Sequence, residues 1–556
     1  MRKIINDPDA FTDETIEGII AAHPGALRRA VAGGRALVRA DAGRSGKVGI
    51  VTGGGSGHLP VFLGYVGLGL CDGVAVGNTF SSPSAEQIAD ATRAVDGGAG
   101  VLYLYGNYGG DIYNFDIAAD LVAAEGITTE TALAADDVAS APAASRATRR
   151  GVAGMIYAFK IAGAAAERGD DLAGVASIAR RVGERTRTMG VGLSPTILPA
   201  AGEPTFHLDE GEMEVGIGIH GEPGVHRGRL ETADQIADRL VGAVLDDLDA
   251  PAGSTVSVLV NGLGATPLEE LYILYRRAAR LIAERDLSIH APLVGNYVTS
   301  LEAAGASISV LLLDDELTEL LDAPAASPFF RHGAVDVLDV EPAAGPVAAS
   351  ATAAIGDHPD AVPTAFAERV LAVLAVLPEH AEELRELDAA LGDGDLGITV
   401  AEGSRAAGDA MRRDPSLEPA ELLRRAGAAF ASANPSTFAA LVGGAVVGAA
   451  ADLSGDPLDP LVASALASSV ADRIRARGGA EAGDKTVVDA LLAGAGAGTD
   501  LDAVIDAVRR AVDDGAERTS KRGRAAWLQE RSVGLRDPGM VAYLRFLEDL
   551  RATRTR

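Results

Sequence analysis

The sequence predicts two domains of different fold class: an α/β domain with a mainly parallel sheet over residues 1–335, then an all-α domain over residues 360–556. In the first region, short apolar runs alternate with stretches whose apolar residues recur at helical spacing, which favours a sheet covered by helices. In the second region, helical spacing dominates and no convincing strand occurs. Residues 336–359 are mostly small residues and prolines without periodicity, which indicates a linker.

Composition limits the class of protein further. A chain of 556 residues is too long for one hydrophobic core, so two to four domains are expected. The single cysteine, Cys71, cannot form an intrachain disulfide, which fits the reducing cytoplasm. The chain start lacks the apolar stretch of a signal peptide, and the apolar runs are too short to span a bilayer. The formal net charge of −29 argues against nucleic acid as a partner.

The expected elements of the first domain can be placed from their periodicity. Four apolar runs have the character of strands, and they lie at 47–55, 99–107, 254–264 and 306–316. Two stretches between them have apolar residues at helical spacing, 232–248 and 268–286. In a sheet of this kind, functional side chains are expected in the loops that follow the strands.

Three glycine-flanked loops in this domain carry candidate functional side chains. His58 lies in "GGGSGHLP" (53–60), Asp111 lies in "GNYGGDIYNFD" (106–116), and His220 lies in "GIGIHGEPG" (216–224). The glycines let backbone N–H groups approach a small polar ligand, although this is no dinucleotide fingerprint. A lone histidine is usually structural, but three such loops after strands favour one shared cleft.

The second domain contains an acidic cluster and a basic stretch. Asp388, Asp393 and Asp395 lie within "LDAALGDGDLGI" (387–398), where carboxylates around a turn can converge on a divalent cation such as Mg²⁺. "GDKTVVDAL" (483–491) places a turn before a helix, and residues 518–536 carry six basic side chains and one acid. A polyphosphate ligand would need a metal or this patch to offset the acidic chain. The alternatives are a solvated turn and a solvated helix face.

Together these stretches resemble the dihydroxyacetone kinase family, in its single-chain, ATP-using form. The resemblance covers nearly the whole chain and includes "GGGSGH", "GNYGGDIYNF", "GIGIHGEPG", "SPFF", "GDGDLG", "GDKTVVDAL" and "QERSVGLRDPG" in this order. It implies an α/β ketone-binding domain built of two subdomains, followed by an all-helical barrel that binds ATP.

The resemblance also implies roles for the ketone site. The family's ketone forms a covalent hemiaminal with the histidine that corresponds to His220, a reaction that selects carbonyl compounds over simple polyols. Asp111 would accept the proton of the attacking hydroxyl group, and His58 would hydrogen-bond and orient the bound ketone. The pocket would be lined by Gly55, Ser56 and Gly57.

The resemblance assigns the acids of the second domain to the cofactors. Asp388, Asp393 and Asp395 correspond to the family's acidic triad, which holds two Mg²⁺ ions on the phosphates of ATP. Metal ions between these acids and the phosphates would offset the repulsion between the acidic chain and ATP. The expected nucleotide contacts are Thr486, Gly523, Arg524 and Asp537.

Some positions depart from the family's pattern. Gly106 stands where the family often has lysine, and the missing side chain opens space for a four-carbon ketose such as erythrulose. Asn434 and Pro435 fall where the family has a Gly-Ser-Gly type of turn, so Asn434 is a candidate nucleotide contact of altered geometry. Leu396 follows the aspartates where histidine is common, which speaks against an essential side chain there.

Three functions are consistent with the sequence. The leading hypothesis is an ATP-dependent kinase, acting on dihydroxyacetone or erythrulose and forming a cytoplasmic homodimer, with no membrane or nucleic-acid partner. The second is a ketose-binding regulatory protein, against which the acidic triad and the fused helical domain count. The third is a kinase charged by a phosphocarrier protein, although no phosphocarrier domain is visible. The sequence leaves open which ketose is used, and whether the chain cyclises a flavin nucleotide.

Overall fold

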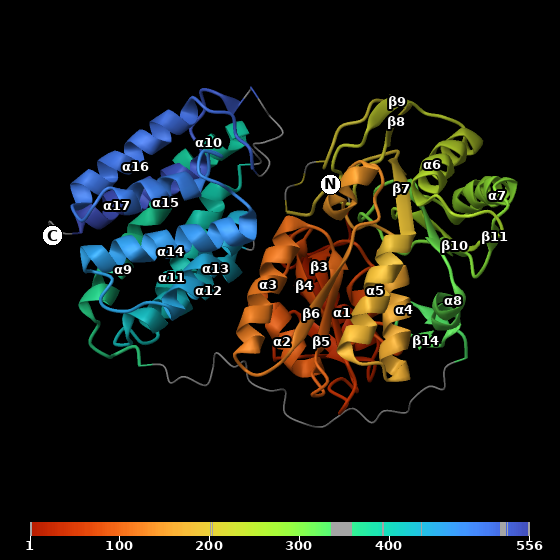
Figure 1. The fold of residues 1–556 in the computed structure, drawn as a ribbon, viewed down its shortest axis with the longest axis horizontal. Helices are drawn as coiled ribbons and strands as arrows, with labels where there is room; N and C mark the ends of the chain where they lie inside the picture. The colour runs from red at the N-terminus through yellow and green to blue at the C-terminus, as the bar shows by residue number, and fades with distance from the viewer. Residues whose placement is uncertain are drawn as a thin grey trace. The chain divides into compact units, whose positions relative to one another are not determined.

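The computed structural model describes residues 3–200, 202, 204–334, 358–391, 394–434, 436–522, 530 and 532–553. The chain forms two compact units, Met1–Ser350 and Ala351–Arg556. Figure 1 shows sheets and helices in the first unit and helices in the second. The predicted linker, 336–359, lies outside the described residues except for 358–359, so its boundaries stay a prediction.

The first sheet has six strands and carries the first two candidate loops. The strands predicted at 47–55 and 99–107 are confirmed as β3 and β5, in which Ile50, Val51, Val101, Tyr103 and Tyr105 are residues that favour strands. The three pairs among β4, β3, β5 and β6 are parallel, and β1 and β2 are added antiparallel at one edge. In spatial order the strands are β1 (Leu27–Arg29), β2 (Ala36–Arg39), β4 (Gly73–Thr79), β3 (Gly49–Ser56), β5 (Val101–Gly106) and β6 (Thr129–Ala134).

Helices cover both faces of this sheet. On one face α2 (Ala85–Val95) and α3 (Gly109–Ala123) bury Val51, Tyr103 and Tyr105. On the other, Ile50, Leu102 and Leu104 form a core with α1 (Phe11–Ala22), α4 (Met155–Arg168) and α5 (Leu172–Arg185). Figure 1 shows α2 and α3 on one side and α4 and α5 on the other. The loops at the strand ends are therefore fixed by a core on each side.

The second sheet forms the other subdomain and is mostly antiparallel. Its strands are, in spatial order, β11 (Ser288–Ile289), β10 (Thr255–Gly262), β13 (Gly305–Leu312), β7 (Thr186–Gly192), β8 (Glu212–Val215) and β9 (His226–Arg229), with β12 (Leu293–Gly295) also paired to β10. Only β11 and β12 pair in parallel with β10. The mainly parallel prediction is wrong for this sheet, because a parallel pair needs a crossover and the described residues linking β7, β8 and β9 contain no helix.

The remaining elements of the first unit complete the second subdomain. The predicted strands at 254–264 and 306–316 form β10 and β13, and the predicted helices form α6 (Ala233–Leu248) and α7 (Leu268–Glu284). A capping box between Thr232 and Gln235 fixes the start of α6. The smaller elements are α8 (Asp315–Asp322), β14 (Ala325–Ala326), β15 (Arg331–His332) and the 3-10 turns Leu63–Tyr65 and Ala143–Thr148.

The second unit is a ring of helices, and no strand occurs in the part of 358–553 that the structure describes. Each helix from α10 to α17 packs on the next, and α17 returns to α9 and α10. The ring surrounds an apolar cavity of about 350 Å³. The predicted all-α barrel is confirmed. Its helices are α9 (Ala365–Val376), α10 (Ala381–Leu391), α11 (Leu396–Arg412), α12 (Pro419–Ala433), α13 (Thr437–Ala451), α14 (Pro460–Gly478), α15 (Val487–Gly496), α16 (Leu501–Ala516) and α17 (Pro538–Ala552), with a 3-10 turn at Leu377–His380.

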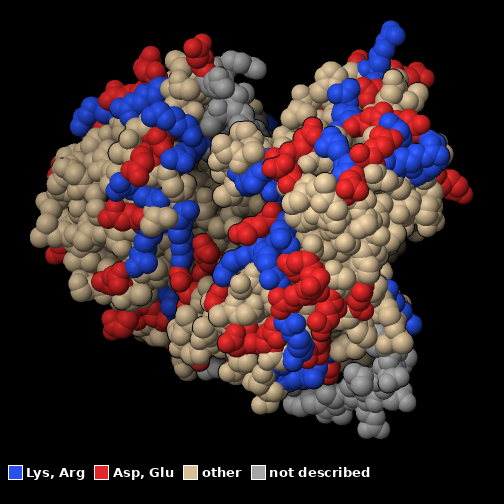
Figure 2. Space-filling view, turned by 45° about the vertical axis from the view of Figure 1, so that its right-hand side comes forward, with Lys and Arg blue, Asp and Glu red and all other residues tan. Residues whose placement is uncertain are grey.

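The surface is charged in a mixed way despite the net charge of −29. Figure 2 shows Lys and Arg side chains interleaved with Asp and Glu on the face in view. Exposed side chains also form ion pairs, such as Arg276–Asp234 and Arg277–Asp238. None of the helices in the described ranges is long and apolar enough to cross a bilayer.

The core of the second subdomain provides a stability prediction. Leu240 of α6 is fully buried among strands of the second sheet, so Leu240→Ala should lower the free energy of unfolding by about 2–5 kcal/mol through lost contacts and a cavity. Urea denaturation, followed by intrinsic fluorescence and circular dichroism, measures the change. Leu268→Ala on α7 is the matched control, because Leu268 is 51 % exposed. Equal losses for both variants would contradict the assigned core.

Candidate active site

Strand ends bring the three predicted catalytic side chains of the first unit together. His58 follows β3, and Asp111 lies in the first turn of α3, directly after β5. Because β3 and β5 are parallel neighbours, their carboxyl ends meet at one edge of the sheet. His220 reaches the same place from the second sheet, in the loop after β8. The ring centroids of His58 and His220 are 4.8 Å apart, at an interplanar angle of 75°.

Aromatic rings enclose the two imidazoles. Phe80 stacks on His58, with centroids 4.5 Å apart and an interplanar angle of 5°. The same Phe80 ring meets His220 edge-on at 5.4 Å, and Tyr108 meets His220 edge-on at 4.9 Å. These contacts restrict the orientation of both imidazoles; His58 is buried, whereas the His220 side chain is 26 % exposed.

Hydrogen bonds define which ring nitrogen of each histidine is free. Nδ1 of His58 lies 2.7 Å from the Thr299 carbonyl oxygen, which only accepts, so Nδ1 carries the proton. Its Nε2 is buried and has no hydrogen-bond partner in the described structure. Nδ1 of His220 lies 2.9 Å from Oε1 of Glu222, and the backbone N–H of His220 donates to Oε2 at 2.9 Å. A carboxylate also only accepts, so in the neutral imidazole of His220 the proton lies on Nδ1 and Nε2 keeps its lone pair.

Burial controls the protonation of the other groups in this cluster. Desolvation, together with the nearby charge of His220, lowers the pKa of His58 to about 3. Burial raises the pKa of Asp111 to about 7, although a hydrogen bond from Ser82 and the charge of His220 act in the opposite direction. Burial also acts to raise the pKa of Glu222, but the bond and charge of His220 and the charge of Arg150 outweigh it and lower it to about 2. At neutral pH, Glu222 is therefore ionised and His58 neutral.

Three predicted lining residues, Gly55, Ser56 and Gly57, have well-defined surroundings. A side chain on Gly55 would meet the backbone of Ser81 at 2.6 Å, and one on Gly57, whose φ is +97°, would meet the Phe80 ring at 2.9 Å. Glycine at both positions thus admits the segment after β4. Ser56 turns toward α1, where its hydroxyl lies 3.0 Å from that of Thr12.

Gly106 ends β5 beside the cluster. A Cβ there would lie 3.2 Å from the Tyr108 ring and 3.3 Å from Met155, so even alanine would press on Tyr108. The space that the missing side chain at position 106 was expected to open for a larger ketose is therefore partly occupied by Tyr108 and Met155.

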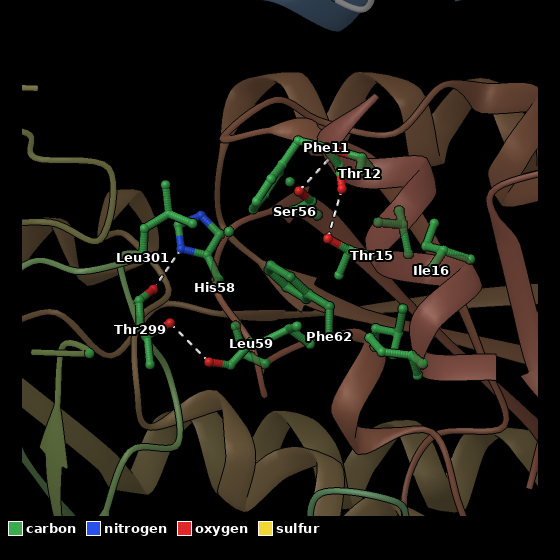
Figure 3. A pocket seen from close by; sticks show the side chains of 18 of the residues that line it. Phe11, Thr12, Thr15, Ile16, Ser56, His58, Leu59, Phe62, Thr299 and Leu301 are labelled. Carbon is green, nitrogen blue, oxygen red and sulfur yellow. Dashed lines mark hydrogen bonds between the residues drawn. The ribbon is translucent and has the colours of Figure 1, made fainter. Parts of the chain in front are cut away.

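A cavity of about 520 Å³ adjoins the cluster but is not the same space. It is lined by Gly54 to His58 and by α1, and by neither Asp111 nor His220. Figure 3 shows Thr12 and Thr15 of α1 on one side of this cavity and His58 on the other. We place the chemistry at the cluster, because the unpartnered Asp111 oxygen and His58 nitrogen lie there.

Several residues of this site were not found by the sequence analysis: Phe80, Ser82, Tyr108, Glu222, Thr299 and Arg150. Phe80 and Ser82 follow β4, which is parallel to β3, so the end of β4 lies at the same edge of the sheet as the end of β3. The polar residues after "GVAVGNT" could therefore have been predicted to belong to the site. Glu222 belongs to the quoted "GIGIHGEPG" loop, and its spacing of two from His220 was visible. Thr299 comes from a distant segment, and only the fold brings it to His58.

In the second unit, two of the three predicted metal ligands are described. Asp388 lies in the last turn of α10, where Oδ2 accepts the backbone N–H of Leu396 at 3.1 Å. Asp395 precedes α11, and burial together with the charge of Asp388 raises its pKa to about 6. Asp393 lies outside the described residues. Among the described residues, no group of three or more His, Cys, Asp or Glu side chains is arranged to hold a metal ion. The oxygen donors and their mutual repulsion suit Mg²⁺.

The predicted nucleotide contacts lie at helix starts or outside the described structure. Thr486 caps α15 in a capping box with Asp489, and Asp537 caps α17 by accepting the N–H of Met540 at 2.8 Å. Burial raises the pKa of Asp537 to about 7 against the effects of that bond and of Lys485, while Asp489 and Asp388 raise it further. Asn434 donates to Glu402 at 3.3 Å. Gly523 and Arg524 lie outside the described residues.

Comparison with known proteins matches both units. Residues 17–329 match the Dak1 domain and residues 390–552 match the DAK2 domain. The chain belongs to the dihydroxyacetone kinase family. It is 38 % identical to L-erythrulose 1-kinase of Mycolicibacterium smegmatis over 99 % of both chains. It is 39 % identical to D-erythrulose kinase of the same organism, over 98 % of this chain and 97 % of that one.

A solved member of the dihydroxyacetone kinase family shares this fold. The dihydroxyacetone kinase of C. freundii, in complex with AMP-PNP and Mg²⁺, matches with a TM-score of 0.54 and 27 % identity over 99 % of both chains. The match includes the helical unit as well as the α/β unit. The predicted fold class is confirmed, apart from the strand direction in the second sheet.

The burial of Asp111 gives a direct titration test. Its carboxyl group should titrate near pH 7, and Ser82→Ala should raise the pKa further, because the hydrogen bond that favours the charged form is lost. Carboxyl-labelled ¹³C NMR follows the titration, and Asp111→Asn identifies the signal. Ser81→Ala, one residue away, should leave it unchanged. A midpoint of about 4, as for a solvated aspartate, would contradict the burial of Asp111.

Proposed function

We propose that the protein is an ATP-dependent kinase that phosphorylates a hydroxyl group of a short-chain ketose, dihydroxyacetone or erythrulose, held as a hemiaminal on His220. The observation that carries the proposal is the bond between Nδ1 of His220 and Glu222, 2.9 Å long, which leaves Nε2 as the free nucleophile. Two unpartnered buried atoms, Nε2 of His58 and Oδ1 of Asp111, belong to the same cluster. In this proposal, residues 1–335 bind the ketose and residues 360–556 bind ATP.

The addition step balances without any further reactant. Nε2 of His220 forms a bond to the carbonyl carbon, and the electron pair of the C=O double bond moves to oxygen. The imidazole thereby gains a positive charge and the oxygen a negative one. Transfer of one proton from the ring, whose Nδ1–H is shared with Glu222, to the oxygen gives the neutral hemiaminal. Nε2 of His58 has a lone pair and accepts a hydrogen bond from a ketose hydroxyl.

Asp111 suits the role of general base. A carboxyl group with a pKa of about 7 is partly ionised at neutral pH, yet basic enough to accept a hydroxyl proton. Covalent fixation of the ketose holds the reacting hydroxyl in place for a substrate too small to offer many contacts. Mg²⁺ held by Asp388, Asp393 and Asp395 would neutralise the charge on the ATP phosphates. Thr486, Gly523, Arg524, Asp537 and Asn434 are proposed to contact the nucleotide.

Two alternatives and two further properties belong to the proposal. A ketose-binding regulator would not need the helical unit, which the full-length match to two erythrulose kinases includes. Supply of phosphate by a phosphocarrier protein is disfavoured by the similarity to a kinase solved with AMP-PNP. A homodimer, implied by the family resemblance, is tested by sedimentation velocity. A cytoplasmic location is supported by the single, buried Cys71.

The test uses the purified protein with ATP, Mg²⁺ and ketose, and no other protein. Phosphorylated ketose should form, and Asp111→Asn should reduce turnover by roughly 10²–10⁴-fold while ¹³C NMR of carbonyl-labelled dihydroxyacetone still shows the adduct. His220→Ala should remove the adduct signal itself. His226→Ala is the matched control, because His226 is a histidine on β9; this variant should keep both the adduct signal and the kinase turnover.

Each failure has a separate meaning in this experiment. An adduct that persists in His220→Ala would exclude His220 as the nucleophile. If product formed only after a phosphocarrier protein was added, that protein and not ATP would be the phosphate donor. Binding of ketose without ATP consumption would support the regulator.

Gly106 should influence which ketose is used. Gly106→Ala places a methyl group against Tyr108 and Met155, so we expect kcat/KM for erythrulose to fall about tenfold, and that for dihydroxyacetone to fall less. Kinetics with dihydroxyacetone, D-erythrulose and L-erythrulose measure the ratio. Gly242→Ala, whose methyl would meet nothing within 4 Å, is the control. Equal losses for all three ketoses would show that Gly106 has no part in selectivity.

A further inference from the structure

A row of alternating charges lies behind His220. The carboxylate of Asp137, whose side chain is 2 % exposed, binds the Arg150 guanidinium through Nη2 at 2.7 Å and Nε at 2.9 Å. Arg150 also donates from Nη2 to the Gly216 carbonyl at 3.1 Å. It is thus tied both to the core and to the start of the loop that carries His220. Glu222 is next in the row, followed by His220 itself.

Gly218 provides the space in which Arg150 and Glu222 approach each other. A Cβ on Gly218 would lie 2.2 Å from Oε2 of Glu222 and 2.7 Å from Nη1 of Arg150. The Glu222 carboxylate and the Arg150 guanidinium therefore both lie next to the Cα atom of Gly218. Arg150 forms its ion pair with Asp137, and its positive charge acts on Glu222 over a longer distance. Any side chain at position 218 would displace the carboxylate.

We propose that Arg150 and Gly218 are positioning residues for His220: Arg150 places a positive charge beside the half-buried Glu222 carboxylate, and Gly218 leaves that carboxylate room to receive both bonds from His220. This inference rests on the proposed function, in which Nε2 of His220 adds to the ketone. It goes beyond that function by naming what holds the nucleophile in its reactive form.

The tautomer of His220 is the physical link. With Glu222 in place, the proton lies on Nδ1 and Nε2 has a lone pair. If the carboxylate moves away, Nδ1 loses its acceptor, and the imidazole can instead carry the proton on Nε2. In that form Nε2 cannot add to a carbonyl carbon. A displaced or protonated Glu222 therefore lowers adduct formation without changing Asp111.

The same row predicts a pH effect of known sign. The titratable and charged groups facing His220 are Glu222, Asp111, His58 and Tyr108. Those facing Glu222 are His220, Arg150 and the Tyr108 hydroxyl. Removing the positive charge of Arg150 raises the pKa of Glu222, because that charge helps to hold it below its usual range, so Glu222 loses its charge at a higher pH. The acidic limb of adduct formation should therefore move to higher pH.

The experiment measures the adduct without ATP, by ¹³C NMR of carbonyl-labelled dihydroxyacetone over a range of pH. Arg150→Met should shift the acidic limb upward by about one pH unit, a roughly tenfold loss of adduct at a fixed acidic pH. Gly218→Ala keeps every charge, and it should weaken the adduct about tenfold at all pH values. At saturating ketose its kcat should change far less than its KM, because Asp111 is untouched.

Two controls separate positioning from general damage. Gly228→Ala on β9 places a methyl group 2.8 Å from Nε2 of His226, a comparable displacement of a flexible side chain outside the site, and should change nothing. Arg149→Met breaks another buried Arg–Asp pair, with Asp247 at 2.7 Å, and should lower stability without shifting the pH profile. Gly218→Ala itself should fold, because only the ends of two flexible side chains must move.

A second measurement keeps the inference separate from the proposed function. ¹⁵N NMR of the imidazoles, recorded without ketose, should show His220 protonated on Nδ1 in the wild type and partly on Nε2 in Gly218→Ala. If the wild type formed no adduct, the hemiaminal would fail, and the ¹⁵N spectra would still decide the role of Arg150 and Gly218. Spectra and pH profiles of both variants that match the wild type would overturn the inference.

Discussion

The site in the first unit depends on keeping ionisable side chains out of water without giving them every hydrogen bond that water would supply. His58 and Asp111 are both buried, and each has one polar atom without a partner in the described structure. An unsatisfied buried polar atom costs about 1–3 kcal/mol, so the surrounding fold has to offset it. It does so with an apolar core on each face of the first sheet. The same desolvation moves the pKa of Asp111 toward neutrality, where a base is useful.

The sequence predicts those parts of the structure that depend on residues close together in the chain, and it does not predict those that depend on contacts between distant segments. Strands β3, β5, β10 and β13 and helices α6 and α7 were predictable because their apolar periodicity is a property of consecutive residues. The antiparallel direction of the second sheet was not, since it depends on how strands distant in sequence pair. The loops with His58, Asp111 and His220 were found from their glycines. Phe80 and Thr299 complete the site through tertiary packing alone, which a residue pattern does not record.

Ser56 shows the limit of transferring a role by resemblance. The motif places it among the pocket residues, and the loop does adjoin the cluster. Its hydroxyl, however, faces Thr12 of α1, so its described bond supports the loop. Gly55 and Gly57 serve the loop in another way, since the space they leave is filled by Ser81 and Phe80. The glycine-rich stretch thus acts at least partly by letting two backbone segments approach closely.

The described residues of the second unit bear on how an acidic chain can meet a polyphosphate, which the sequence left open between a metal and the basic stretch at 518–536. The described cations of that stretch already have acidic partners. Arg522 and Lys521 bind Asp484 at 2.9 and 3.5 Å, and Arg536 binds Asp513 at 2.8 Å.

Lys485, next to Asp484 in the sequence, is buried and donates to the carbonyl oxygens of Ser532 and Arg518. Asp388 and Asp395, in contrast, repel each other, and burial leaves that repulsion weakly screened. A divalent cation between them would remove the repulsion and present positive charge to a phosphate in one step. Among the residues of this unit that the structure describes, the distribution of partners therefore favours metal ions over arginines as the counter-charge for ATP.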